Sequence, residues 1–255
     1  MDVTKLLSRL SFIIFICFVS YTKLFAETNL WYAQFQSGVN FPLSKSNKIF
    51  VDNGSNFPSP ENKDTYTVSH SSHASFMLTV GNKINTTLQY LKYYTLSGRL
   101  QYNLPTSIDG KVKQYSDPQF LNYKYNWDIS NLALTLDTKL GLYNYNELSF
   151  YVNGGLGVSF NSAESFDEKP LINVTPRISP DFSDNTITQL TYHIGIGVDY
   201  TFIPKWIASF GYEFASFGDF RSGKGGTTWA NESLKLRAYQ TNTVSLGVTH
   251  FINLQ

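Results

Sequence analysis

Six ionisable side chains stand out because each interrupts a segment that otherwise alternates between apolar residues and small or polar ones. They are Arg99, Asp137, Lys139, His193, Asp199 and Glu213. All six fall on the polar side of their alternation, and buried charges are costly unless they are paired. We therefore expect Arg99 to pair with Glu213 or Asp199. Lys139 is expected to pair with Asp137 or another acid of the same face, with exposed pairing at a surface as the alternative.

Catalysis is the chemistry to test first, because a histidine beside a serine and an acid can activate a nucleophile. His193 shares its face with Ser159, Ser209 and Glu213. No His-x-Ser spacing marks a lipid-facing triad in these segments. We therefore expect no catalytic residue and a protein that is not an enzyme.

Two other patterns could hold a ligand. His70 and His73 enclose two serines, with no carboxylate or thiol at metal-ligand spacing, so a solvated loop is expected there. Residues 218–226 hold four glycines with Arg221 and Lys224, but they lack the spacing of a phosphate-binding loop and are expected to form a flexible loop. The sequence thus predicts no metal and no cofactor.

These residues lie in segments whose apolar and polar residues alternate with a period of two, as in β-strands with two unlike faces. In residues 148–160 one face carries Phe150, Leu156 and Phe160, and the other carries Asn153 and Ser159. Eight segments follow this pattern: residues 31–41, 74–80, 94–104, about 123–142, 148–160, 188–202, 206–216 and 244–254.

The connections between these segments alternate in length. The long ones are residues 42–73, 105–122, 161–186 and 218–239, and the short ones are residues 82–90, 141–147 and 203–205. This asymmetry is typical of an up-and-down antiparallel barrel in a membrane, with long extracellular loops and short periplasmic turns. Clusters of Pro, Ser, Gly and charge lead us to expect the long loops to be hydrated and partly mobile.

A soluble ligand-carrying barrel would show the same period, so the kind of residue on each face has to decide. The small residues fit a crowded interior, and they are Gly155, Gly157, Gly195, Gly197, Gly211 and Gly247. Aromatic residues near the strand ends suit interfacial belts, and they are Trp31, Tyr143, Tyr145, Tyr200, Phe202, Trp206 and Tyr239. These features favour an all-β transmembrane barrel of eight strands.

The N-terminus has the pattern of a secretory signal peptide. Lys5 and Arg9 precede a short apolar run at residues 12–19, and Ala26 closes the segment. We expect residues 1–26 to be a cleaved signal and residues 27–255 to be the barrel domain. The mature chain then has no cysteine, since Cys17 is removed, and it has 17 basic and 18 acidic residues. A net charge of −1 gives no electrostatic case for nucleic acid.

The architecture and the last segment, VSLGVTHFINLQ at residues 244–255, resemble the small eight-stranded outer membrane barrels of the OmpA/OmpX type and the opacity proteins. That resemblance implies a location in the outer membrane, contact with its lipid and lipopolysaccharide, and recognition of the last strand by the outer membrane assembly machinery. Those families generally end on Phe, whereas Phe251 here lies on the opposite parity from Val244 and Leu246, and Gln255 ends the chain. A bulge in the last strand would reconcile the two patterns.

The leading functional hypothesis is a non-enzymatic surface platform whose long loops contact a host or envelope ligand. A small pore is the main alternative, because polar residues such as Asn153 and Thr191 face inward. An eight-stranded lumen is nearly filled by side chains, so its conductance should be small. A lipid A modifying enzyme and a soluble periplasmic carrier are further alternatives.

Overall fold

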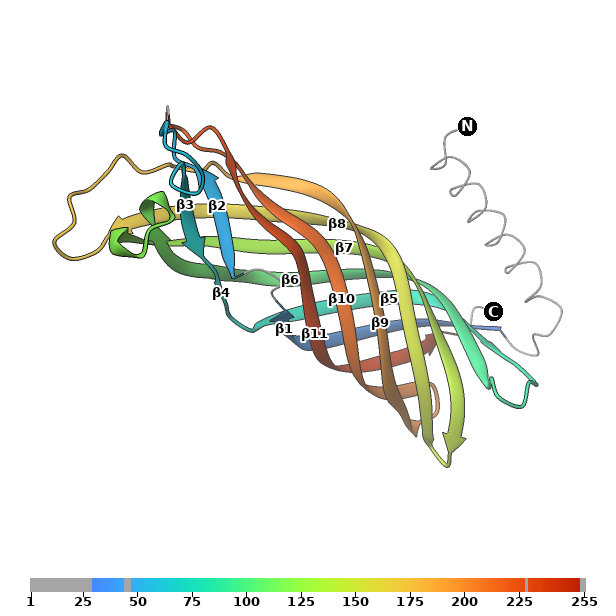
Figure 1. Ribbon diagram of the computed structural model, residues 1–255. Helices are drawn as coiled ribbons and strands as arrows, with labels where there is room; N and C mark the ends of the chain where they lie inside the picture. Colours follow the sequence, from blue (N-terminus) through green and yellow to red (C-terminus); the bar gives the residue numbers. More distant parts are fainter. Residues whose placement is uncertain (1–28, 44–46, 228, 253–255) are drawn as a thin grey trace, which may run out of the picture.

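The computed structural model describes residues 29–43, 47–227 and 229–252. The predicted signal peptide at residues 1–26 and the last three residues of the predicted assembly signal lie outside this range. Eight long strands form the barrel (Figure 1): β1 (Asn29–Leu43), β5 (His73–Asn85), β6 (Tyr93–Lys113), β7 (Leu121–Tyr145), β8 (Leu148–Pro170), β9 (Asn185–Ile203), β10 (Trp206–Lys224) and β11 (Ser233–Ile252).

Each of these strands pairs antiparallel with the next, and β1 pairs with β11 to close the ring. The predicted eight-stranded, up-and-down barrel is confirmed. Connections of a few residues join β5 to β6, β7 to β8 and β9 to β10, at the end of the barrel where β1 begins and β11 ends (Figure 1). The ladder between β1 and β11 runs from Trp31 opposite Ile252 to Leu43 opposite Gln240 without a shift, so the bulge considered for the last strand is absent from this ladder.

The far end of the barrel differs from the expectation of hydrated, mobile loops. Strands β6, β8 and β10 continue well into segments that were expected to be loops. Within the first long connection, β2 (Lys48–Asp52) and β3 (Lys63–Thr67) form a hairpin, and β3 and the short β4 (Ser69–His70) pair with β6. The loop expectation was wrong for these segments because their apolar residues bury one another in a core.

Strand β7 shows how the two halves of the barrel differ. Along its membrane half, Leu134 and Leu136 point outward and are 53% and 68% exposed. Along its outer half, Trp127 and Ile129 are buried instead, with the opposite parity. The apolar residues thus change sides around Asn131. One half of the strand meets lipid on the outside, and the other half meets water on the outside and a core within.

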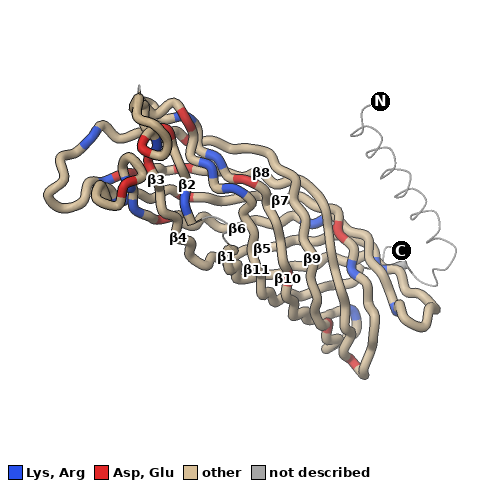
Figure 2. The backbone as a smooth tube through the Cα atoms, viewed as in Figure 1, with Lys and Arg blue, Asp and Glu red and all other residues tan. Residues whose placement is uncertain are grey.

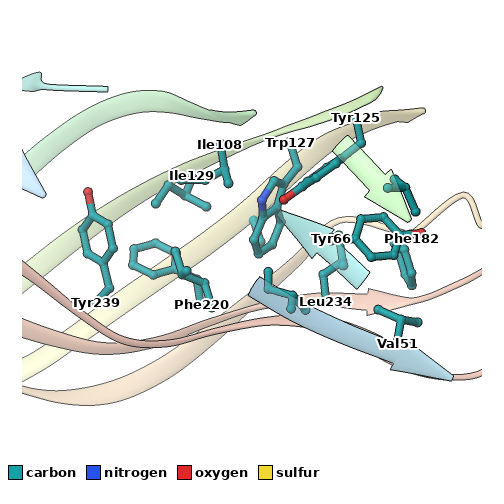
Figure 3. Close-up of a cluster of buried hydrophobic side chains, with 14 of the residues drawn as sticks. Val51, Tyr66, Ile108, Tyr125, Trp127, Ile129, Phe182, Phe220, Leu234 and Tyr239 are labelled. Carbon is teal, nitrogen blue, oxygen red and sulfur yellow. The ribbon is translucent and has the colours of Figure 1, made fainter. Parts of the chain in front are cut away.

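The buried apolar residues at the outer end form one cluster, which we call the outer core (Figure 3). It joins β7, β10 and β11 to the β2–β3 hairpin, and Trp127, Tyr66 and Phe220 are among its largest buried side chains. The outer halves of the long strands, the hairpin and the connections around this core are called the head below. Strands β6, β7 and β8 have 21, 25 and 23 residues, about twice the 9–11 that cross a bilayer, so the head extends beyond the membrane.

The outer surface of the other half is apolar on every strand. Exposed residues on this band include Phe35, Phe76, Leu78, Leu100, Leu136, Leu156, Leu190, Ile194, Phe210 and Leu246. Trp31, Tyr143, Tyr145, Tyr200, Phe202 and Trp206 are also exposed, as expected for an interfacial belt. Tyr239 was wrongly placed in that belt, because it packs inside the outer core. No helix in the described part of the chain is long and apolar enough to span a membrane.

Candidate functional site

The interior of the membrane half is crossed by an ion pair between β6 and β10. Arg99 Nη1 lies 2.7 Å from Glu213 Oε2, and Arg99 Nη2 lies 2.8 Å from Glu213 Oε1. Asp137 of β7 adds a second acid at 3.6 Å from the same guanidinium. His193 of β9 lies 3.1 Å from Asp137 and 3.3 Å from Arg99. Four strands therefore meet at one buried charge cluster.

A second pair lies nearer the short turns. Lys139 Nζ lies 3.2 Å from Asp199 Oδ2, and the hydroxyls of Tyr93 and Ser209 both donate hydrogen bonds to this carboxylate. The ammonium of Lys139 also sits 4.0 Å from the centre of the Tyr151 ring. The surrounding donors satisfy the acid that the strand alternation had placed inside the barrel.

All six ionisable residues singled out in the sequence therefore lie in the barrel interior, in two groups that we call the lumen network. Arg99 binds Glu213, one of its two expected partners, while its other expected partner Asp199 binds Lys139 instead. Asp137, considered for Lys139, contacts Arg99 and His193. Each cation of the lumen network therefore faces at least one acid, which offsets part of the cost of burying charge.

Glycine makes room for this network. A Cβ atom on Gly155 would lie 2.3 Å from Asp137 Oδ1 and 2.5 Å from His193 Cε1. On Gly197, it would lie 2.3 Å from the Tyr151 hydroxyl. The inward glycines thus let longer side chains from neighbouring strands reach across a narrow lumen.

A layer of amides lies between the lumen network and the outer core, and it was not predicted from the sequence. Asn40 donates to Asn103, Asn103 donates to Asn131, and Asn131 donates to Ser159. Asn161 completes the layer by donating to the backbone oxygens of the β10 strand, 2.7 Å from that of Phe217. The sequence did hold a signal for this layer. Asn103 lies on the same face of its strand as Arg99, and Asn131 lies on the same face as Asp137.

The lumen has little free space. A cavity of about 30 Å³ lies beside the Arg99–Glu213 pair, and another of about 20 Å³ lies among Lys83, Tyr93 and Phe251 at the end with the short turns. Such volumes hold about one or two water molecules. Toward the outer end of the barrel, the buried side chains of the amide layer and the outer core fill the interior.

Arg177, from the connection after β8, fastens the head. Its guanidinium donates to Asp64 of the hairpin at 2.5 Å and to Glu168 of β8 at 2.8 Å. The rings of Tyr123 and Trp229 lie 4.8 Å and 4.6 Å from it. Both carboxylates are 1% exposed. Although burial opposes the charge, hydrogen bonding to Glu168 keeps the pKa of Arg177 above its ordinary value.

The two histidines of the first connection do not lie in a solvated loop, as the sequence led us to expect. His70 and His73 are partly and largely buried, and their rings lie 6.1 Å and 6.4 Å from that of Tyr239. The apolar surroundings that Tyr239 and the outer core supply explain the difference. Within the described residues, no group of three or more His, Cys, Asp or Glu side chains could hold a metal ion.

His193 is poorly placed for nucleophilic catalysis. It is 6% exposed, and its Nε2 faces Arg99 and Asp137. Ser209 donates its hydroxyl to Asp199, and Ser159 donates to Asn161. Neither serine that the sequence placed on this face is oriented as a nucleophile by the histidine.

A closed antiparallel ring of eight strands, apolar outside and polar inside over its membrane half, decides the class of protein. The chain is an integral β-barrel of the outer-membrane type. The apolar band and its aromatic rim confirm the choice of a membrane barrel over a soluble one, since a soluble carrier would leave these residues in water.

No protein-family model matches the chain. No curated protein sequence matches it either. Its fold is similar to that of the outer membrane protein OprG from Pseudomonas aeruginosa, at 17% identity over 90% of this chain and 98% of that chain, with a TM-score of 0.48. Neisserial surface protein A gives 12% identity over 88% and 99% of the two chains, with a TM-score of 0.42.

The outer membrane protease OmpT from Escherichia coli is also similar, at 10% identity over 88% of this chain and 97% of that chain, with a TM-score of 0.39. These are likenesses of fold at low identity, and they include an enzyme. A fold alone does not determine function.

Proposed function

We propose that the protein is a closed outer membrane barrel that presents a rigid, folded head at the cell surface, where it contacts envelope or host molecules. The observation that carries this proposal is the outer core. Its buried residues come from the hairpin and from β6, β7, β8, β10 and β11, so they fix the extracellular segments to one another. A surface held this way is preorganised for binding.

A pore is the weaker alternative. Ions would have to cross the Arg99–Glu213 pair, the amide layer and the outer core in turn. Opening such a path would leave buried charges and amides without partners, which is costly. An enzyme working from the lumen is weaker still, because His193 is enclosed by Arg99 and Asp137.

Conductance of the full chain, folded and reconstituted in planar lipid bilayers, tests the closed lumen. We expect no stable conductance steps. Reproducible steps of constant size from the folded, heat-modifiable protein would contradict the proposal and favour the pore.

Surface presentation needs a second measurement. A short epitope placed after Ile172, which is 91% exposed in the connection after β8, should be labelled by antibody on intact cells. A matched epitope in the turn at Asn146 and Glu147 should be labelled only after the outer membrane is permeabilised. The reverse pattern would contradict the assignment of the head to the outside.

A further inference from the structure

A groove of about 380 Å³ runs along the outside of the head between β2 and β11. The hairpin strand β2 ends the hydrogen-bonded path of the sheet, and it lies close to β11 without being paired with it. Blue segments gather along these strands at the outer end of the barrel (Figure 2). The groove is lined by four cations, Lys48, Lys63, Lys235 and Arg237, with the half-exposed ring of Phe50 beside them.

Two cations of this groove, Lys235 and Arg237, carry charges that no nearby acid of the described residues pairs with. Glu232 is the acid of the groove's lining, and one of its carboxylate oxygens accepts a hydrogen bond from the backbone N–H of Asp52 at 3.1 Å. In the ladder between β10 and β11, Arg221 lies directly opposite Lys235. Like charges placed this way repel each other, and a bound anion would offset that repulsion.

The groove also lies at a particular height. Leu43 is exposed at the upper edge of the apolar band, and it is paired with Gln240 of β11. Arg237 is three residues further along β11, which is about 10 Å at the rise of a β-strand. Its side chain and that of Lys235 point away from the barrel, since Leu234 and Leu236, which alternate with them along β11, are buried. Lys235 and Arg237 therefore lie just beyond the apolar band, on the side of the head.

We propose that this groove binds the phosphate groups of a glycolipid anchored in the outer leaflet, that is, of lipopolysaccharide. The proposal rests on the proposed function, which places the head outside the membrane. The planar guanidinium of Arg237 can bind two phosphate oxygens at once, and Lys63 and Lys235 supply point charges beside it. Phe50 offers an apolar surface for the sugar or the start of an acyl chain. Bound phosphate would also relieve the repulsion between Arg221 and Lys235.

The test uses the full-length folded protein in nanodiscs that lack lipopolysaccharide. Binding of purified lipopolysaccharide is measured for the native protein and for the double variant Lys235→Gln/Arg237→Gln. Loss of two charge-assisted contacts should weaken binding about tenfold or more. The matched control is Lys111→Gln/Lys124→Gln, which removes another exposed pair of opposed lysines from the head, on β6 and β7. Lys124 lines one pocket with Asp109 and Asp167, so the control should change binding less than about twofold.

Two further probes separate the sources of phosphate. Chemically dephosphorylated lipopolysaccharide should bind the native protein about as weakly as intact lipopolysaccharide binds the double variant. Soluble inorganic pyrophosphate should compete only weakly, because it lacks the membrane anchor that raises local concentration. Equal loss in both double variants, undiminished binding of the dephosphorylated glycolipid, or competition by pyrophosphate at equal concentration would each overturn the proposal. Conductance and epitope labelling of the same variants test the proposed function separately, and these substitutions should leave both unchanged.

Discussion

Arg99 and Glu213 face each other across the barrel with two N–O contacts of 2.7 Å and 2.8 Å, one to each carboxylate oxygen. They are 3% and 8% exposed, and they come from strands on opposite sides of the ring. A paired arrangement of this kind is the strongest geometry available to an arginine and a carboxylate.

Removing one partner should therefore be worse than removing both. We expect Arg99→Met to cost about 3–5 kcal/mol of unfolding free energy, because Glu213 stays buried without its main counter-ion. The double variant Arg99→Met/Glu213→Leu should recover most of that loss. Urea unfolding in lipid vesicles, followed by tryptophan fluorescence and by gel mobility without boiling, measures both. If the double variant were no more stable than the single one, the unpaired charge of Glu213 would not be the cause of the lost stability.

Arg177 should control the head without controlling the barrel. Arg177→Ala leaves Asp64 and Glu168 buried without a counter-ion, so we expect the hairpin and the connection after β8 to become sensitive to protease. Arg177→Lys keeps the charge but loses the paired contacts and the stacking, and it should be intermediate. Limited proteolysis with mass mapping is the measurement. Heat-modifiable migration of the barrel should persist in both variants, and its loss would mean that head and barrel form one cooperative unit.

The outer core makes a similar prediction through packing. Trp127 is fully buried, and Trp127→Ala should destabilise the head by about 3–5 kcal/mol through the cavity that it leaves. Hydrogen exchange should then increase along β2, β3 and the outer half of β7. Exchange in the membrane half, for example around Leu136, should stay slow. Uniformly faster exchange over the whole chain would contradict a separate head.

The apolar band can be tested by charge. Leu136 is 68% exposed and faces outward, so Leu136→Arg should cost about 2–4 kcal/mol if that position meets the bilayer. Leu136→Ala separates the loss of packing from the cost of the charge. Folding efficiency into vesicles and the urea midpoint give the values. A barrel surrounded by water would tolerate the arginine at almost no cost.

Alkaline pH should loosen the head through Tyr66. Burial raises the pKa of its phenol well above the ordinary value of 10, and the nearby Glu168 raises it further. A raised pKa means that the contribution to stability is complete below pH 10 and is lost as pH rises toward the folded value. Tyrosinate absorbance should therefore appear together with protease sensitivity of the head. In Tyr66→Phe the onset should move to higher pH, and an unchanged onset would assign the transition to another group.

The membrane half was readable from the sequence because its pattern has a single cause. Lipid outside and a crowded lumen inside impose strict alternation, so Leu156 and Asn153 could be assigned to opposite faces without coordinates. The same parity placed Arg99, Asp137, Lys139, His193, Asp199 and Glu213 inside. Which acid each cation contacts could not be predicted, because partners across the lumen depend on stagger and side-chain reach rather than on parity.

The head was missed for a physical reason as well. Its apolar residues alternate too, but with the opposite phase. Strand β7 shows this change: the buried apolar residues Trp127 and Ile129 have odd numbers, whereas the exposed Leu134 and Leu136 have even numbers. A search for continuous alternation ends where the phase changes and assigns the rest to a loop. The hairpin strands of five residues, with Ile49 and Val51 on the buried side, are too short to stand out alone. Their burial depends on partners far away in the chain.

Pairing of β1 with β11 has a consequence for how the chain must fold. The first and last strands supply each other's missing hydrogen bonds, so until β11 has arrived β1 offers an open edge to any other chain. Closure brings together segments separated by almost the entire described sequence, which makes it a slow and entropically expensive step. Closure of the barrel should therefore be a late, all-or-none step. Until it occurs, unfinished chains should depend on a chaperone that covers the free edges of β1 and β11.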